Sequence, residues 1–247
     1  MYKVSAISYL NTVPFLYGLK KTGFISSVEL SIDTPAACAK KLLTGAADIG
    51  IVPVAILPEL KHPHIITDYC IGARGAVKSV ILASNTSVNK IRKVYLDYQS
   101  RSSVMLVQVL AYHHWKIKPE FVHSQSDEQL LKLKENEAAV IIGDRALQHY
   151  SSFAHVYDLA AEWMAFSGLP FVFACWVGNK KIDPEFVKSF NQALKAGVDN
   201  IDEVVRSLDV SKYPETDFHH YFTKNVDYQL DDDMRQGMNL FLKYLTS

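Results

Sequence analysis

Residues 1–20 read MYKVSAISYLNTVPFLYGLK, and this stretch contains the unit from which the fold can be predicted. Residues 3–7 form a short, mostly apolar run, which is typical of a strand. Residues 14–20 begin with proline, a residue that is favoured in the first turn of a helix. The polar residues between them follow a strand and precede a helix, which is where open α/β sheets bind their ligands.

The same alternation of strand and helix patterns continues to about residue 177. Strands are predicted at residues 3–7, 28–32, 47–52, 79–84, 93–96, 138–142 and 171–177. Helices are predicted at residues 14–20, 36–43, 102–115, 127–136, 145–150, 159–166, 184–196, 199–208, 215–223 and 231–245. The alternation predicts an α/β protein with largely parallel sheets and a helical C-terminal region.

No linker rich in Pro, Gly or Ser divides the chain, so we expect the backbone to pass between two lobes through strands. The most polar break, residues 84–93, is the expected first crossing, and residues 176–181 are the expected second crossing. Residues 87–177 then form a middle lobe inserted into an outer lobe of residues 1–86 and 178–247. A lobe of roughly 90 residues has an ordinary domain size.

The composition argues against several classes of protein. The 247 residues include 26 Lys and Arg and 26 Asp and Glu, so a partner that is nucleic acid or an anionic membrane is not expected. No long apolar run and no secretory signal is present, which predicts a cytoplasmic protein without a membrane span. The chain has an odd number of cysteines, and they are widely spaced, which predicts buried free thiols at Cys38, Cys70 and Cys175. The nine histidines lack metal-binding spacing, so no metal site is expected.

Four polar segments, residues 8–14, 72–79, 96–103 and 141–147, follow or precede predicted strands and could contribute to a binding site. The third of them combines hydroxyl groups, an arginine and the start of a helix, and this combination suits a carboxylate. The candidate residues are Ser8, Asn11, Ser79, Ser100, Arg101, Ser102, Ser103, Gly143 and Asp144.

Each segment also has a purely structural interpretation. Asn11 could cap the helix that begins near Pro14, and Ser102 or Ser103 could cap the next long helix. Residues 72–79 could form a glycine-rich turn with solvated charges. Asp144 is either an acid or base, or a helix cap or hydrogen-bond acceptor between the lobes. No GxSxG motif or cysteine–histidine pair is present, so these residues would bind a small carboxylate and supply few proton carriers.

Several blocks of the sequence together resemble a known family. They are SYLNTVP at 8–14, DIGIVP at 48–53, KSVIL at 78–82, LD at 96–97 with SRSSV at 100–104, IGDRAL at 142–147, EW at 162–163 and SGLPFVFACW at 167–176. This pattern, which runs over nearly the whole chain, is similar to that of the chorismate dehydratases of the futalosine route to menaquinone. The resemblance implies the two-lobed fold of type II periplasmic binding proteins, with a cleft between the lobes that closes over a ligand.

The resemblance also implies the reaction, in which chorismate loses water to give 3-[(1-carboxyvinyl)oxy]benzoate without a cofactor. Under this hypothesis Ser102, Ser103 and the N-terminus of their helix bind one carboxylate, and Asn11 and Ser79 hold the other end of the substrate. The substrate's own enolpyruvyl carboxylate would remove the proton, with Asn11 orienting it or the leaving hydroxyl. Asp144 is the fallback base.

Other functions share the same fold, because a fold does not determine function. One is a non-catalytic small-carboxylate-binding protein, and another is the sister enzyme 1,4-dihydroxy-6-naphthoate synthase, which acts on a futalosine-derived substrate. A transcriptional-regulator domain would need a helix-turn-helix segment, and no basic recognition helix is evident. The sequence does not indicate an oligomeric state.

Overall fold

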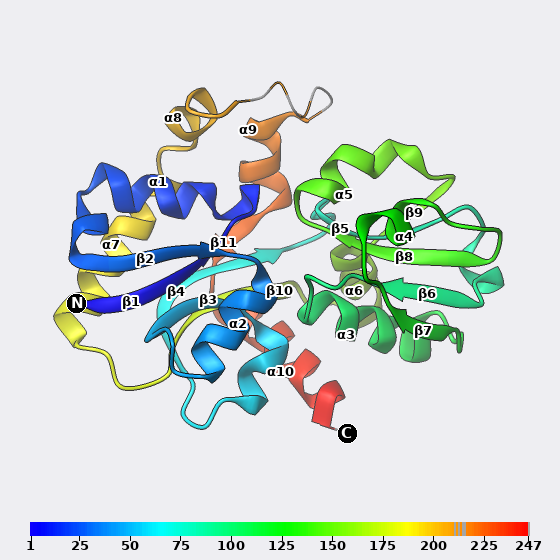
Figure 1. Ribbon diagram of the computed structural model, residues 1–247, viewed down its shortest axis with the longest axis horizontal. Coiled ribbons are helices and arrows are strands. Elements are labelled where there is room, and N and C mark those ends of the chain that lie inside the picture. Colours follow the sequence, from blue (N-terminus) through cyan, green and yellow to red (C-terminus); the bar gives the residue numbers. More distant parts are fainter. Residues whose placement is uncertain (210, 212, 214–215, 247) are drawn as a thin grey trace.

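The computed structural model describes residues 1–209, 211, 213 and 216–246, and it has two α/β lobes that lie side by side (Figure 1). Each lobe is built around its own mixed sheet. The second lobe, green in Figure 1, is formed by a continuous middle stretch of the chain, and the first lobe is formed by the segments before and after it.

The sheet of the first lobe has the order β11-β4-β10-β3-β1-β2. Its strands are β1 (Tyr2–Ile7), β2 (Val28–Asp33), β3 (Ile49–Pro53), β4 (His64–Ala73), β10 (Phe171–Gly178) and β11 (Asp227–Gln229). Strand β1 is parallel to β2 and β3, whereas β10 is antiparallel to both β3 and β4. Strands β3 and β10 are buried at every position, which is the continuous apolar pattern of strands covered on both faces.

The sheet of the second lobe has the order β7-β6-β8-β5-β9. Its strands are β5 (Val80–Ser84), β6 (Lys93–Leu96), β7 (Glu120–His123), β8 (Glu137–Ile142) and β9 (His155–Asp158). Strand β6 is parallel to β7 and β8, and β5 is antiparallel to β8 and β9.

Helices cover the faces of both sheets. In the first lobe, α2 packs on β1 and β3, α7 packs on β4 with α1 beside it, and α10 packs on β10. The helices are α1 (Val13–Lys21), α2 (Pro35–Leu43), α3 (Ser102–Val109), α4 (Asp127–Leu131), α5 (Asp144–His149), α6 (Leu159–Ser167), α7 (Pro184–Val198), α8 (Ile201–Arg206), α9 (Phe218–His220) and α10 (Asp232–Thr246). Helix α7 buries Phe190, Ala193, Leu194 and Gly197, the spacing of one helical face.

Short 3₁₀ and π turns complete the connections. They are η1 (Leu10–Thr12), η2 (Phe24–Ser27), η3 (Val54–Glu59), η4 (Val88–Lys90), η5 (Leu110–His114), η6 (Tyr150–Ser152) and η8 (Tyr221–Asn225). The helix expected at 102–115 is thus α3 followed by the π turn η5, and the helix expected at 127–136 ends at Leu131. Of the helix expected at 215–223, residue 215 lies outside the described residues, residues 216–217 are not helical, and residues 218–223 are α9 and part of η8.

The prediction of largely parallel sheets is wrong, because β5 and β10 run against their sheet neighbours. Both strands begin at the junction between the lobes, just after the chain has crossed from one lobe to the other. Strands β1, β3, β6 and β8 instead end near this junction and are followed there by turns or helices. The direction of β5 and β10 therefore follows from the exchange of the chain between the lobes.

The expected lobe boundaries are displaced for the same reason. Strand β5 pairs in the second sheet, so the first crossing lies between Ala73 and Val80 instead of at residues 84–93. Strand β10 pairs in the first sheet along its whole length, so the second crossing precedes Phe171 instead of lying at residues 176–181. The polar residues 84–93 form a turn between β5 and β6 inside the second lobe, so their polarity reflects surface exposure.

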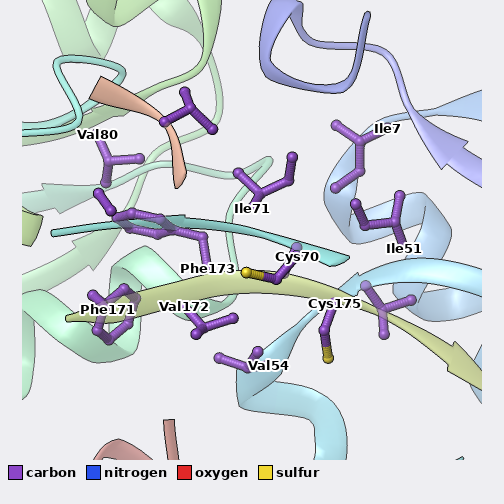
Figure 2. Packing of buried hydrophobic residues seen from close by; sticks show 14 of the residues in the cluster. Ile7, Ile51, Val54, Cys70, Ile71, Val80, Phe171, Val172, Phe173 and Cys175 are labelled. Carbon is purple, nitrogen blue, oxygen red and sulfur yellow. The ribbon is translucent and has the colours of Figure 1, made fainter. Parts of the chain in front are cut away.

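The apolar core continues through the junction of the two lobes. Figure 2 shows Ile71 of β4, Val80 of β5 and Phe173 of β10 side by side, although β5 belongs to the second sheet. All three cysteines are buried free thiols, as predicted, and burial raises the pKa of Cys38 to about 11 and that of Cys175 to about 12. None of the helices in the described ranges combines the length and hydropathy needed to cross a bilayer.

Candidate active site

The two lobes meet around a pocket at the strand ends described above. The pocket encloses about 490 Å³ of space between protein atoms, its open mouth included. It is lined by Ile7, Tyr9, Asn11, Pro35, Pro53, Ile71, Ser79, Val80, Ser100, Arg101, Ser102, Ser103, Ile142, Gly143, Phe173 and Ala174. All of the predicted site residues except Ser8 and Asp144 are therefore brought together in its wall.

Asn11 enters the pocket from the first lobe on the 3₁₀ turn η1, between β1 and α1. The predicted capping role is not what the structure shows, because α1 begins at Val13 and has no side-chain cap. Among the described residues, the only hydrogen bond of the Asn11 side chain comes from the Thr12 hydroxyl, which donates to Oδ1 over 3.3 Å. The Asn11 amide group therefore remains able to donate a hydrogen bond to a ligand.

The three serines at the start of α3 have different roles. Ser100 lies one residue before Arg101, the N-cap residue of α3, and its Oγ accepts the Ser103 N–H of the first helical turn at 3.2 Å. The Ser102 hydroxyl is used between the lobes: it donates to the Phe173 carbonyl at 2.9 Å and accepts the Ala55 N–H at 3.2 Å. The Ser103 hydroxyl has no protein partner within the described part of the chain, so it is the serine whose side chain can bind a ligand.

Phe173 accepts the Ser102 hydrogen bond because the pairing of β10 with β4 is irregular at this point. Val172 lies opposite Gly72 and Ala174 lies opposite Ile71, so Phe173 is an extra residue in the ladder. Such a bulge leaves a backbone carbonyl free of its usual strand partner. Neither this bulge nor Tyr9, which also lines the pocket, was predicted as part of the site; both lie inside sequence blocks that carry the family resemblance.

Arg101 is exposed at the pocket, and its guanidinium has no carboxylate partner among the described residues. Two other arginines near the lobe junction are not free in this way. Arg74 forms ion pairs with Asp227, Asp231 and Asp233, so the turn at 72–79 does not offer it to a ligand. Arg145 is held by a buried carboxylate, as described next.

Asp97 and Arg145 fix the loop that carries the serines. The Arg145 guanidinium donates to both oxygens of Asp97, at 2.9 and 2.7 Å, and Asp97 is 1% exposed. Asp97 also accepts the Gln99 N–H and the Ile142 N–H. Burial raises the pKa of Asp97, while Arg145 and these N–H donors act against that rise. The pair therefore serves the site by holding its loops, and sequence reasoning did not identify it.

Gly143 and Ser79 close the wall of the pocket from the second lobe. The Gly143 N–H donates to the Ser79 carbonyl at 2.7 Å, and the Ser79 side chain is fully buried. Gly143 has a φ of +64°, and a Cβ at this position would lie 2.8 Å from ring atoms of Tyr9. Only glycine fits here, since any side chain would meet both backbone strain and the Tyr9 ring.

Ser8 and Asp144 lie outside the pocket wall. Ser8 is exposed, and its N–H donates to the Asp33 carbonyl at 2.9 Å, so the prediction that it binds substrate has no support in this geometry. Asp144 accepts the Leu10 N–H at 2.9 Å and the Tyr213 hydroxyl at 3.2 Å. These contacts favour the interpretation of Asp144 as an acceptor between the lobes over that of an acid or base.

A family model described as menaquinone biosynthesis matches residues 2–247. The chain belongs to this family. The family resemblance that the sequence blocks indicated is therefore confirmed. No group of three or more metal-ligating side chains is found among the described residues.

Two curated relatives carry the same enzyme name. The chorismate dehydratase of Thermus thermophilus is 26% identical over an alignment 263 positions long, which covers 96% of this chain and 92% of the relative. The chorismate dehydratase of Campylobacter jejuni is 28% identical over 191 residues, covering 74% of this chain and 71% of the relative. Both alignments cover more than two thirds of each chain.

A solved structure from Candida albicans, described as exhibiting the generic periplasmic binding protein fold, superposes with a TM-score of 0.67. The two chains are 13% identical, and the match covers 100% of this chain and 90% of the other. At this identity the likeness concerns the fold alone. It confirms the predicted two-lobed fold with a cleft between the lobes.

Proposed function

We propose that this chain is a carbon–oxygen lyase that removes water from chorismate to give 3-[(1-carboxyvinyl)oxy]benzoate. The observation that carries the proposal is the wall of the interlobe pocket. It consists of apolar side chains, neutral hydroxyl and amide groups and the unpaired Arg101, with no carboxylate or imidazole contributed by the described residues. Such a wall suits a small anionic ring compound. The two relatives named chorismate dehydratase support the same substrate.

The proposed reaction is an elimination whose product is aromatic. A proton leaves the ring carbon that bears the ether oxygen, and its electron pair forms the new ring double bond as the hydroxyl on the neighbouring carbon departs. The proton and the hydroxide together make the water that is lost. Because aromatisation drives the step, the enzyme mainly has to hold one conformer and position the departing groups.

The two carboxylates of chorismate match two parts of the pocket. Arg101, the Ser103 hydroxyl and the N-terminus of α3 provide charge and donors for one carboxylate. Asn11, from the first lobe, and Ser79, just before β5 in the second lobe, also line the pocket and would hold the enolpyruvyl end and the ring hydroxyl. With no protein base in the described wall, the enolpyruvyl carboxylate of the substrate is the proton acceptor, and Asn11 orients it or the leaving hydroxyl.

Asn11→Ala tests the catalytic half of this assignment. We expect kcat for chorismate loss to fall by about 100-fold or more, the usual effect of removing one donor that acts in the transition state. Asn89→Ala, at an exposed position in η4, is the matched control and should leave kcat unchanged. Near-wild-type turnover by Asn11→Ala would remove Asn11 from the mechanism.

Arg101→Gln tests the binding half. We expect KM to rise about tenfold or more, since a charge-assisted hydrogen bond to a carboxylate is lost. Isophthalate, a dianion, should inhibit the wild-type chain more strongly than benzoate, a monoanion, and Arg101→Gln should reduce that difference. Arg92→Gln, at an exposed position before β6, is the control. An unchanged KM and an unchanged preference for the dianion would exclude Arg101 from the site.

A further inference from the structure

The Asp144 carboxylate joins parts of the chain that are far apart in sequence. It is the first residue of α5 in the second lobe. Its Oδ1 accepts the backbone N–H of Leu10 in the first lobe at 2.9 Å, and its Oδ2 accepts the Tyr213 hydroxyl at 3.2 Å. Both oxygens are thus engaged, and the side chain does not contribute to the pocket wall.

The residue that Asp144 holds is the immediate neighbour of Asn11. Leu10, Asn11 and Thr12 form the single 3₁₀ turn η1, so the position of the Leu10 backbone determines where the Asn11 amide points. Tyr9, which precedes Leu10, is also held by the second lobe. Its ring packs against Gly143, and its hydroxyl donates to Oε1 of Gln99. Tyr9 and Leu10 are therefore bound by the second lobe, and the next residue, Asn11, lines the pocket.

We propose that Asp144 is a positioning residue that holds the turn carrying Asn11 against the second lobe, so that the Asn11 amide reaches the substrate only when the lobes are closed. The proposal rests on the proposed function in one respect, since it takes Asn11 to act on the reacting groups. It adds that the closed arrangement of the lobes and the competence of Asn11 are coupled in part through the hydrogen bond between Asp144 and the Leu10 N–H. A carboxylate suits this task because it accepts a backbone N–H more strongly than a neutral oxygen does.

The alternative, in which Asp144 removes the substrate proton, makes a different prediction for two variants. A base is lost equally in Asp144→Asn and Asp144→Ala, whereas a positioning acceptor survives in part in Asp144→Asn, whose amide oxygen can still accept the Leu10 N–H. We therefore expect kcat to fall about 30-fold in Asp144→Ala and less than about fivefold in Asp144→Asn, with KM changing much less. Equal losses of kcat in the two variants would overturn the proposal.

A double-mutant cycle tests whether Asp144 acts through its neighbour. If it acts by placing Asn11, then Asp144→Ala should reduce kcat no more than about twofold further when Asn11→Ala is already present. Effects that multiply in the double variant would show that the two residues act independently, and would contradict the proposal. Tyr213→Phe is the matched control, because it removes only the second partner of Asp144 and should change kcat less than about threefold.

A measurement without substrate separates this inference from the proposed function. In hydrogen exchange, the Leu10 amide should exchange at least about tenfold faster in Asp144→Ala than in the wild type, with unchanged melting temperature as evidence of an intact fold. Unchanged exchange at Leu10 would overturn the positioning role, even if the wild-type chain turns over chorismate. Faster exchange in a protein without turnover would instead refute the proposed function and leave the contact between Asp144 and Leu10 established.

Discussion

Replacing Ser102 by alanine should destabilise the protein, whereas replacing the adjacent Ser103 should mainly weaken substrate binding. The Ser102 hydroxyl joins the lobes by donating to the Phe173 carbonyl and accepting the Ala55 N–H, at 2.9 and 3.2 Å. Its side chain is buried, so Ser102→Ala leaves a backbone donor and a backbone acceptor without a partner where water has little access. Ser103 has no such side-chain contact in the described part of the chain.

The magnitude follows from these two lost hydrogen bonds. Each unpaired buried backbone group costs about 1 kcal/mol or more, so Ser102→Ala should lower the free energy of unfolding by about 2 kcal/mol. In a chain of this size 1 kcal/mol shifts Tm by about 2–4 °C, which gives an expected decrease of about 4–8 °C. Ser103→Ala removes a hydroxyl without a protein partner and should lower Tm by less than about 2 °C.

Differential scanning calorimetry of the two variants, together with their steady-state kinetics on chorismate, measures both effects. Ser103→Ala should raise KM about tenfold, since one hydrogen bond to a carboxylate is lost at little cost in stability. Equal decreases in Tm for the two variants, or a stable Ser102→Ala variant with the larger increase in KM, would refute the division of roles between the two serines.

Two further changes have expected outcomes. Gly143→Ala should reduce turnover at least about 100-fold, because the new Cβ would lie 2.8 Å from the Tyr9 ring. Gly168 also has a positive φ, but no atom lies within 4 Å of the place of its Cβ. Gly168→Ala should therefore lower the free energy of unfolding by only about 1 kcal/mol, as measured by thermal unfolding. Burial acts to raise the pKa of Asp33, but hydrogen bonds from Lys41 and from serine hydroxyls lower it below its usual value of 3.8. These hydrogen bonds therefore stabilise the folded protein fully at pH values above 3.8, and the stabilisation is lost as the pH falls through the lower pKa that Asp33 has in the folded state. Lys41→Met should therefore lower Tm at pH 7, and the difference from the wild type should shrink below about pH 3.

Much of the fold could be predicted because the apolar strands have a clear pattern. Strands β3, β5 and β10 are buried throughout and read as uninterrupted apolar runs. The strands that were missed lack that signal: β7 has no fully buried residue, β9 has only one, and β11 has three residues. Strand β4 was missed because Thr67 and Asp68 interrupt its apolar residues, so that it does not read as one apolar run.

The candidate site could be predicted as a set of segments but not as a set of roles. Asn11, Ser79, Ser103 and Arg101 are in segments that meet at the pocket, as the strand-end argument predicted. Which serine is free depends on the Phe173 bulge in another lobe, and local sequence carries no signal for that partner. Long-range contacts of this kind are also why Asp144 could be assigned only to two alternatives.

Incubation of the purified chain with chorismate, followed by chromatography with mass detection, tests whether the chain removes water from this substrate. We expect a product lighter than chorismate by one water, with the ultraviolet absorbance of a substituted benzoate, formed at a rate proportional to the protein added. Chorismate that stays unchanged, whether it binds saturably or not at all, would contradict the proposed function. Saturable binding would favour a non-catalytic binding protein, and the absence of binding would favour the futalosine-derived substrate of 1,4-dihydroxy-6-naphthoate synthase.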